Sequence, residues 1–299
     1  MKNITAIGEI IFNVYPGYIK PGGAPLNFIY HIQKLTGKGT LISRVGNDPH
    51  GKEALEFLRK TNFPVSYIQV DNKLETGIAL ANLDKYKIPH WEIPSGRAFD
   101  FIEIPADSDK IIEDTMCFYF GSLAQRMKKS RIAIQSFFGR DIQYFFDVNI
   151  RQSYYTKEIL ELSLHAADVL KVNEEELFLL HNIFLQGKFD LNQSASAIME
   201  KFNIELAALT LGDKGTWLFN SKESNFYKAT ANNIVDTTGA GDAYSAMLCL
   251  GYLNNMSLIK INQLASDFAA EIIKLPSAIP LEGTFYEKFK PFFSSSAYS

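Results

Sequence analysis

The hydrophobic and polar positions follow two patterns along the chain. Short apolar runs are typical of strands buried inside a parallel sheet, and they occupy residues 4–11, 40–45, 116–120, 144–148, 169–172, 206–211 and 226–229. Apolar residues three or four positions apart predict helices, which we expect near residues 25–35, 48–58, 130–138, 157–165, 191–202 and 258–273. This alternation predicts an α/β fold with a doubly wound, mostly parallel sheet flanked by helices.

A different pattern interrupts the alternation. Residues 65–70, 76–83 and 90–93 are short β-like runs with no helix between them, which predicts a small antiparallel sheet. We therefore expect one domain over residues 1–299, with residues about 12–20 and 64–104 contributing a small β lid. The alternatives are an insertion without a role in the site, or a sheet used for homodimerisation.

Composition and charge narrow the class of protein. The chain has 299 residues, 46% of them hydrophobic and 21% charged, with a net charge of −3, so nothing indicates nucleic-acid binding. Cys117 and Cys249 lie in apolar contexts and lack metal-like spacing, which predicts buried, reduced thiols. Neither a signal peptide nor a long apolar span is evident, so we expect a cytoplasmic protein that does not bind membranes.

One glycine-rich loop carries the clearest chemistry. Gly239 and Gly241 flank Ala240, Asp242 follows directly, and an apolar run then predicts a buried helix. Such a loop offers unpaired N–H groups and the positive end of a helix dipole to a phosphate. Since a phosphate repels a carboxylate, Asp242 is better suited to accept a proton from a hydroxyl that attacks the phosphate. The alternative is that Asp242 only caps the helix.

Polar clusters follow several predicted strands. They occupy residues 121–122, 147–151, 173–176 and 212–215. Ligands of doubly wound sheets bind outside the carboxyl ends of the strands, so we expect these clusters to converge on one edge. Near the N-terminus, Gly22 and Gly23 precede the helix that begins at Pro25, and they indicate either a close approach to a ligand or a plain tight turn.

Four motifs together resemble those of the PfkB, or ribokinase-like, carbohydrate kinases. Residues 236–244 resemble the C-terminal signature, and residues 22–27 with 45–51 resemble the N-terminal one. Residues 173–176 resemble the Asn-x-x-Glu motif, and residues 210–215 resemble the Thr-x-Gly-x-x-Gly nucleotide stretch. The motifs occur in the order of that family and cover nearly the whole chain. Residues 8–9, 22–27 and 120–124 look most like the fructokinase branch.

The resemblance implies ATP-dependent phosphorylation of a sugar hydroxyl, with fructose as the best guess. Asp242 would be the general base, and the N–H groups of residues 239–242, including Gly239, Ala240 and Gly241, would form an anion hole for the γ-phosphate. Asn173 and Glu176 would organise Mg²⁺ through waters. Read without the family, residues 174–176 are an acidic run that the dipole of a helix start favours.

The resemblance also assigns the remaining ligand contacts. Thr210, Gly212, Gly215 and Asn173 would bind the nucleotide, and the sugar would meet Asn13, Gly22, Gly23, Asn27 and Arg151, the last within an Asp-x-Asn-x-Arg run that starts at Asp147. Backbone carbonyls of Asp236 and Thr238 are candidates for a K⁺ site. Arg126 is a weaker candidate for the site, and a surface position is the alternative.

Three departures from the family pattern concern the substrate. Asn13 stands where the family usually has a sugar-binding aspartate, the turn at residues 84–87 lacks a glycine, and residues 276–278 replace a Gly-Ala pair. A neutral amide binds a hydroxyl less strongly than a charged acceptor does. Other acceptors therefore stay open: 2-keto-3-deoxygluconate, ribose and nucleosides.

Two readings from other classes are weaker. A non-catalytic sugar- or nucleotide-binding regulator is disfavoured because Asp242 and the glycine loop are retained. A dinucleotide-dependent oxidoreductase is disfavoured because no Gly-x-Gly-x-x-Gly follows an early strand.

Overall fold

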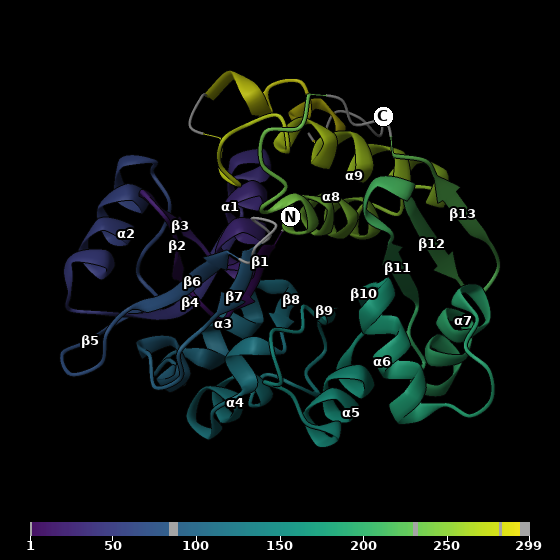
Figure 1. Cartoon of the computed structure of the whole chain (residues 1–299), viewed down its shortest axis with the longest axis horizontal. Helices are drawn as coiled ribbons and strands as arrows, with labels where there is room; N and C mark the ends of the chain where they lie inside the picture. Colours follow the sequence, from purple (N-terminus) through teal and green to yellow (C-terminus); the bar gives the residue numbers. More distant parts are fainter. Residues whose placement is uncertain (1, 84–88, 230–232, 281–282, 294–299) are drawn as a thin grey trace. The chain divides into compact units, whose positions relative to one another are not determined.

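The computed structural model describes residues 2–83, 89–229, 233–280 and 283–293. The chain forms two compact units, which are described separately. Unit 1 comprises Met1–Tyr30, Lys38–Ile142 and Ile150–Tyr155, and unit 2 comprises His31–Gly37, Gln143–Asn149 and Thr156–Ser299. Figure 1 shows the course of the chain. Within the described residues, no helix is both long and apolar enough to span a membrane.

Unit 1 contains one part of the larger sheet. Its strands are β1 (Asn3–Ile7), β4 (Gly39–Gly46), β5 (Ile68–Asp71) and β8 (Thr115–Gly121), in the order β8-β1-β4-β5 with parallel pairing. The helices are α1 (Ala24–Thr36), whose second half belongs to unit 2, α2 (Pro49–Lys60), α3 (Ser108–Asp114) and α4 (Lys128–Gln135). Short 3₁₀ turns lie at Ala98–Phe101 (η1) and Leu123–Gln125 (η2). Asp48 caps α2 as predicted, because its carboxylate accepts the N–H of Gly51 at 2.8 Å.

A small second sheet also belongs to unit 1. Its order is β3 (Tyr18–Gly22), β2 (Ile11–Tyr15), β6 (Gly77–Leu83) and β7 (Pro89–Glu92). The hairpins β2–β3 and β6–β7 are antiparallel, and β2 joins β6 in parallel. The predicted turn at residues 84–87 lies outside the described residues. Whether this sheet closes over a substrate or pairs two copies of the chain stays a prediction.

Two predictions for unit 1 need correction. Residues 65–70 were expected in the small sheet, but β5 pairs with β4 in the larger one, since Ile68 and Asp71 are buried there. Residues 4–11 were expected to form one strand, but the chain turns at Gly8, whose φ is +150°, and divides the run between β1 and β2.

Unit 2 contains the other part of the larger sheet. Strands β9 (Gln143–Asp147), β10 (Val169–Asn173) and β11 (Leu206–Thr210) are parallel, and β12 (Thr216–Asn220) and β13 (Ser224–Tyr227) continue antiparallel from β11. The helices are α5 (Lys157–Ala166), α6 (Glu174–Phe184), α7 (Leu191–Phe202), α8 (Ala240–Leu253) and α9 (Leu258–Ile272). Short 3₁₀ turns lie at Gly212–Lys214 (η3), Gly283–Tyr286 (η4) and Lys290–Phe292 (η5). The predicted α/β class with a mostly parallel sheet, flanking helices and a small additional sheet is confirmed.

Helix α8 is the most deeply buried helix segment of unit 2. Residues 243–251 are all buried, which explains why the sequence there is apolar on every side rather than along one stripe. Helix α9 packs beside it (Figure 1). Since β9, β10 and β11 are parallel, their carboxyl ends share one edge, which brings the polar residues after these strands together.

Candidate active site

The glycine loop ends in an abrupt helix start. Gly239 is the N-cap of α8 with a φ of +81°, a left-handed conformation that glycine adopts without strain. Asp242 is therefore the third residue of the helix, and Gly239 rather than Asp242 occupies the N-cap position. A carboxylate in this first turn is favoured by the helix dipole. The N–H of Ala240 donates to the carbonyl of Thr237 at 3.2 Å, which closes a turn before the helix.

The loop that follows β11 lies against the same helix start. Thr210 ends β11, and Leu211 donates its N–H to the carbonyl of Gly215 at 2.9 Å, which folds the stretch back on itself. A cavity of about 400 Å³ is lined by residues of both loops, among them Thr210, Gly212, Gly215, Ala240 and Gly241. Its remaining wall is largely apolar: Ala229, Ile234, Ala269, Ala270 and Ile273. The structure thus brings the two predicted phosphate and nucleotide stretches together around one space.

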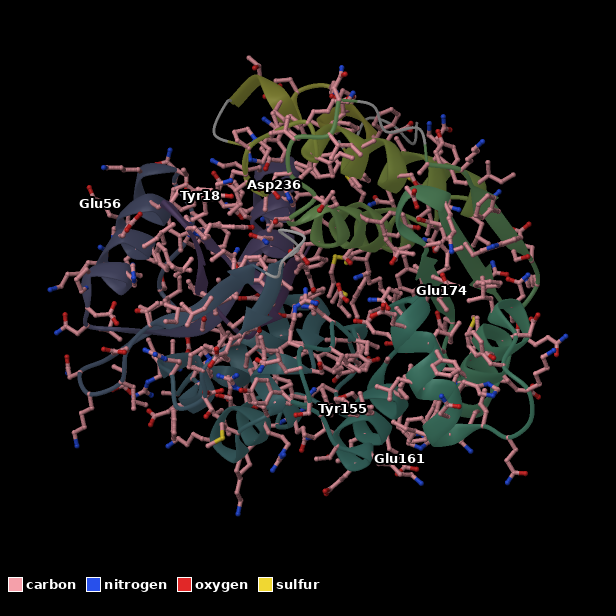
Figure 2. All side chains as sticks on the ribbon, in the orientation of Figure 1. Tyr18, Glu56, Tyr155, Glu161, Glu174 and Asp236 are labelled. Atoms are coloured by element: carbon pink, nitrogen blue, oxygen red, sulfur yellow. The ribbon has the colours of Figure 1, made fainter. Side chains whose placement is uncertain are left out.

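Asn173 and Glu176 cap the N-terminus of α6 by bonding to each other. Glu176 donates its N–H to Asn173 Oδ1 at 2.8 Å, and Asn173 donates its N–H to Glu176 Oε2 at 2.9 Å, which is a reciprocal capping box. Asn173 also pairs with Thr210 in the sheet. A second cavity of about 700 Å³, open beside Thr210 and Gly212, is lined by Asn173 and Glu174, and Figure 2 shows Glu174 in the first turn of α6.

The donor set around α6 suits a hydrated magnesium ion better than a dedicated metal cage. Among the residues that the structure describes, no group of three His, Cys, Asp or Glu side chains gathers to hold a metal. Mg²⁺ keeps several waters and accepts few direct protein ligands. Asn173 Oδ1 and Glu176 Oε2 each accept one N–H group, and because such an oxygen has two lone pairs, this bond does not by itself prevent it from accepting a hydrogen bond from a metal-bound water.

The predicted sugar contacts lie in unit 1. Asn13 is half-buried on β2, opposite Lys20 and Ala79, and its Nδ2 atom would lie 2.7 Å from a Cβ added to Gly22. A Cβ added to Gly23 would lie 2.4 Å from the Glu9 carbonyl oxygen. A larger residue is excluded at Gly23 by the Glu9 backbone and by a φ of +117°, whereas at Gly22 it would displace the end of the Asn13 side chain.

Asn27 and Arg151 complete the set predicted for the sugar. Asn27 is buried on α1, one turn beyond Gly23, whose carbonyl accepts its N–H at 2.9 Å. Arg151 is exposed, and its guanidinium donates to the neighbouring carbonyl of Ile150 at 3.4 Å. No hydrogen bond or ion pair within the described chain links Arg151 to the other four residues.

The comparisons with known proteins decide the family. The model of the pfkB family carbohydrate kinases matches residues 18–282. The chain belongs to this family. A pfkB kinase is a phosphotransferase with a hydroxyl acceptor, so the protein is a sugar kinase with the ribokinase-like fold.

Individual relatives agree with that assignment. An uncharacterized sugar kinase of Pyrococcus horikoshii is 30% identical over 289 residues, which cover 89% of this chain and 88% of the relative. Its structure in complex with ATP has a TM-score of 0.77 and covers 92% of this chain and 93% of that one. A fructokinase of Salmonella typhimurium is 30% identical over 244 residues, 76% of this chain and 75% of the relative, which supports the fructokinase-like branch.

A more distant structure supports the fold of this pfkB kinase. A fructokinase of Vibrio cholerae, solved with fructose, ADP and potassium ion, has a TM-score of 0.77 at 22% identity and covers 98% of this chain and 99% of that one.

One charged residue of this pfkB kinase was not singled out from the sequence. Lys171 lies on β10, is 7% exposed, and donates to Asp147 Oδ1 at 3.1 Å. Burial alone would lower the pKa of Lys171, but the carboxylates of Asp147, Glu176 and Asp242 raise it above its ordinary value. The signal in the sequence is a charge inside an otherwise apolar strand, Val169-Leu170-Lys171-Val172.

Arg126, the weaker candidate, has a structural role. It is 2% exposed and forms a two-pronged ion pair with the fully buried Asp100, at 2.7 and 2.8 Å. Two further N–H groups donate to the carbonyls of Ile93 and Pro94, and the guanidinium lies 4.5 Å from the centroid of the Tyr154 ring. Arg126 is thus not a surface residue, and four of its five N–H donors are used in these contacts.

Proposed function

We propose that this kinase transfers the γ-phosphoryl group of ATP to a hydroxyl of fructose. The observation that carries the proposal is the 400 Å³ cavity lined by both the glycine loop, through Ala240 and Gly241, and the nucleotide stretch, through Thr210, Gly212 and Gly215. Phosphoryl transfer depends chiefly on positioning and on neutralising charge at the transferring group, which helix N–H groups supply. Fructose is favoured because relatives at about 30% identity are fructokinases.

Asp242 is the proposed general base. Its place in the first turn of α8 sets the carboxylate next to the loop proposed to bind the γ-phosphate. There it would accept the proton of the attacking sugar hydroxyl, and the N–H groups of residues 239–242 would stabilise the transferring phosphoryl group. The N–H of Ala240, already bonded to Thr237, can serve only if it is shared or released.

The proposed ions follow from the same loops. Asn173 and Glu176 would hold Mg²⁺ through waters, and the ion would supply neutralisation of phosphate charge when bound. A K⁺ ion beside Asp236 and Thr238 is proposed from the ordered turn there, in which Thr238 donates its N–H to Asp236 Oδ1 at 2.9 Å. Figure 2 marks Asp236.

The acceptor is tested with a panel of sugars. Fructose, 2-keto-3-deoxygluconate, ribose and adenosine are each incubated with ATP and Mg²⁺, and ADP release is followed with and without K⁺. We expect the highest kcat/KM with fructose, no turnover when Mg²⁺ is chelated, and slower turnover without K⁺. Another acceptor that reacts well while fructose is inert would overturn the fructose assignment but leave the kinase assignment intact.

A further inference from the structure

Lys171 is a buried cation whose local partners are defined. It stands opposite Asp147 in the parallel pairing of β10 with β9, and its ammonium donates to Asp147 Oδ1 at 3.1 Å. Asp147 is fully buried, and its second oxygen accepts the hydroxyl of Ser245, on α8, at 3.0 Å. The ion pair therefore connects two strands to the helix that starts at the glycine loop.

The ammonium lies directly beneath the first turn of α8. A Cβ added to Gly241 would be 3.2 Å from Lys171 Nζ. A cation at a helix N-terminus opposes the helix dipole, and a buried charge loses its hydration, so neither factor favours this position for stability. An anion bound at the same helix end would attract the ammonium, and this attraction would offset both costs.

The charged side chains near the proposed phosphate site also favour a role for Lys171 in anion binding. Asp147, Glu176 and Asp242 all interact electrostatically with Lys171. Three carboxylates repel a polyphosphate, and each contributes to a local field that weakens its binding. Lys171 is the side chain that offsets this negative charge from within the strand, close to the loop.

We propose that Lys171 is the fixed countercharge of the phosphate end of the nucleotide site. It offsets the carboxylates and supports the first turn of α8 at Gly241, so that the polyphosphate of ATP binds at residues 239–242. It is a positioning residue, since it acts through Asp147 and Gly241. The inference rests on the proposed function, because it takes the glycine loop as the phosphate site.

A purely structural role for Lys171 makes a different prediction. If the ion pair only connects β9 to β10, breaking it should weaken the binding of adenosine and of all its phosphates by a similar factor. A countercharge affects ligands in proportion to their negative charge. The decisive quantity is therefore the ratio of the Kd values for ATP and adenosine, which differ in the phosphates alone.

The test measures binding of adenosine, AMP, ADP and ATP to Lys171→Gln, Lys171→Arg and the wild type by calorimetry. Glutamine can still donate to Asp147 but carries no charge, and arginine retains the charge. We expect Lys171→Gln to weaken ATP about tenfold or more, the scale of a hydrogen bond to a charged group, with adenosine changed less than about twofold. Lys171→Arg should recover most of the loss.

Two further variants keep the outcome unambiguous. Lys222→Met removes one exposed positive charge from the same unit and should leave the ratio unchanged. If Lys171→Gln does not fold, Asp147→Asn is measured instead. This variant removes a negative charge rather than a positive one, so it should strengthen the binding of ATP relative to the binding of adenosine. An unchanged ratio in the folded variants, or an equal loss for all four ligands, would overturn the countercharge. A wild type that binds no ATP would instead overturn the proposed function itself.

Discussion

At the scale of single residues, Asp242 combines two properties that a general base for a hydroxyl needs. It is only partly buried, and it occupies the first turn of α8, where the helix dipole favours the ionised carboxylate. Gly239 takes the N-cap position with positive φ, so Asp242 is the third residue of the helix, beside the proposed phosphate loop.

Replacing Asp242 by asparagine tests its role. We expect Asp242→Asn to reduce kcat by about a hundredfold or more, since general-base catalysis contributes on that scale, while ATP still binds. Steady-state kinetics and calorimetry measure the two quantities. Glu223→Gln, an exposed change in the same unit, serves as control and should keep full turnover. Unaltered kcat in Asp242→Asn would remove this residue from the mechanism.

Asn13 offers a test of substrate affinity. Asn13→Asp should lower the KM for the preferred sugar about tenfold, because a charged acceptor binds a hydroxyl more strongly than an amide does. Asn192→Asp, an exposed change on α7 of unit 2, adds the same charge at a residue that is not among the proposed sugar contacts and should leave KM unchanged. A KM that stays the same or rises in Asn13→Asp would show that this side chain does not accept a sugar hydroxyl.

At the scale of elements, the ion pair of Asp100 with Arg126 holds η1 against η2 within unit 1. Asp100→Asn leaves the buried guanidinium without its countercharge, so we expect a loss of about 3–5 kcal/mol in the free energy of unfolding. Urea denaturation measures it. The matched control is Glu56→Gln, which breaks an exposed pair with Lys60 on α2 (Figure 2) and should have no measurable effect. Equal effects of the two changes would refute the structural role of Arg126.

The elements that the sequence predicted well are those with a strong local signal. Residues 191–202 were predicted as a helix and form α7 with those bounds, because apolar spacing and the Asp190 cap act locally. For helix α6 the acidic run at residues 174–176 predicts only a helix start, as the alternative to a metal motif, and the rest of the helix is not predicted from the sequence. Strand β5 was placed in the wrong sheet because strand pairing depends on distant residues.

In the candidate site, too, features with a local signal were predicted from the sequence, and contacts between distant residues were not. The loops at residues 210–215 and 239–242 were predicted from glycines at fixed spacing, and their meeting around one cavity follows from the topology of unit 2. Lys171 could not be assigned a partner from sequence, because the register that sets it opposite Asp147 is a property of the folded sheet. Arg126 likewise depends on Asp100, 26 residues away.

At the scale of the whole molecule, acid stability depends on a histidine buried in unit 2. Burial lowers the pKa of His31 from 6.5 to about 3, and His31 Nδ1 lies 2.9 Å from the Tyr286 hydroxyl. The unfolded chain therefore binds a proton below pH 6.5 that the folded protein does not bind until about pH 3. Stability from this group falls as the pH drops through that range.

We expect His31 to lower the free energy of unfolding by about 2 kcal/mol between pH 6.5 and pH 5, since one proton contributes roughly 1.4 kcal/mol per pH unit. Urea denaturation at the two pH values, with the wild type and His31→Gln, measures the loss of free energy of unfolding for each protein. The variant should lose about 2 kcal/mol less than the wild type over this interval, whatever its stability at pH 6.5. The same loss in both proteins would show that His31 does not govern the acid response.

Phosphorus NMR of the wild-type enzyme with ATP, Mg²⁺ and fructose observes directly whether the γ-phosphoryl group of ATP passes to a sugar hydroxyl. We expect the γ-phosphate signal to be replaced by one phosphate-ester signal, in equal amount to the ADP formed. Two results would contradict a sugar kinase activity. In one, ATP is converted to ADP and inorganic phosphate, and no ester forms from fructose or from the other acceptors of the panel. In the other, ATP stays intact with all of these acceptors.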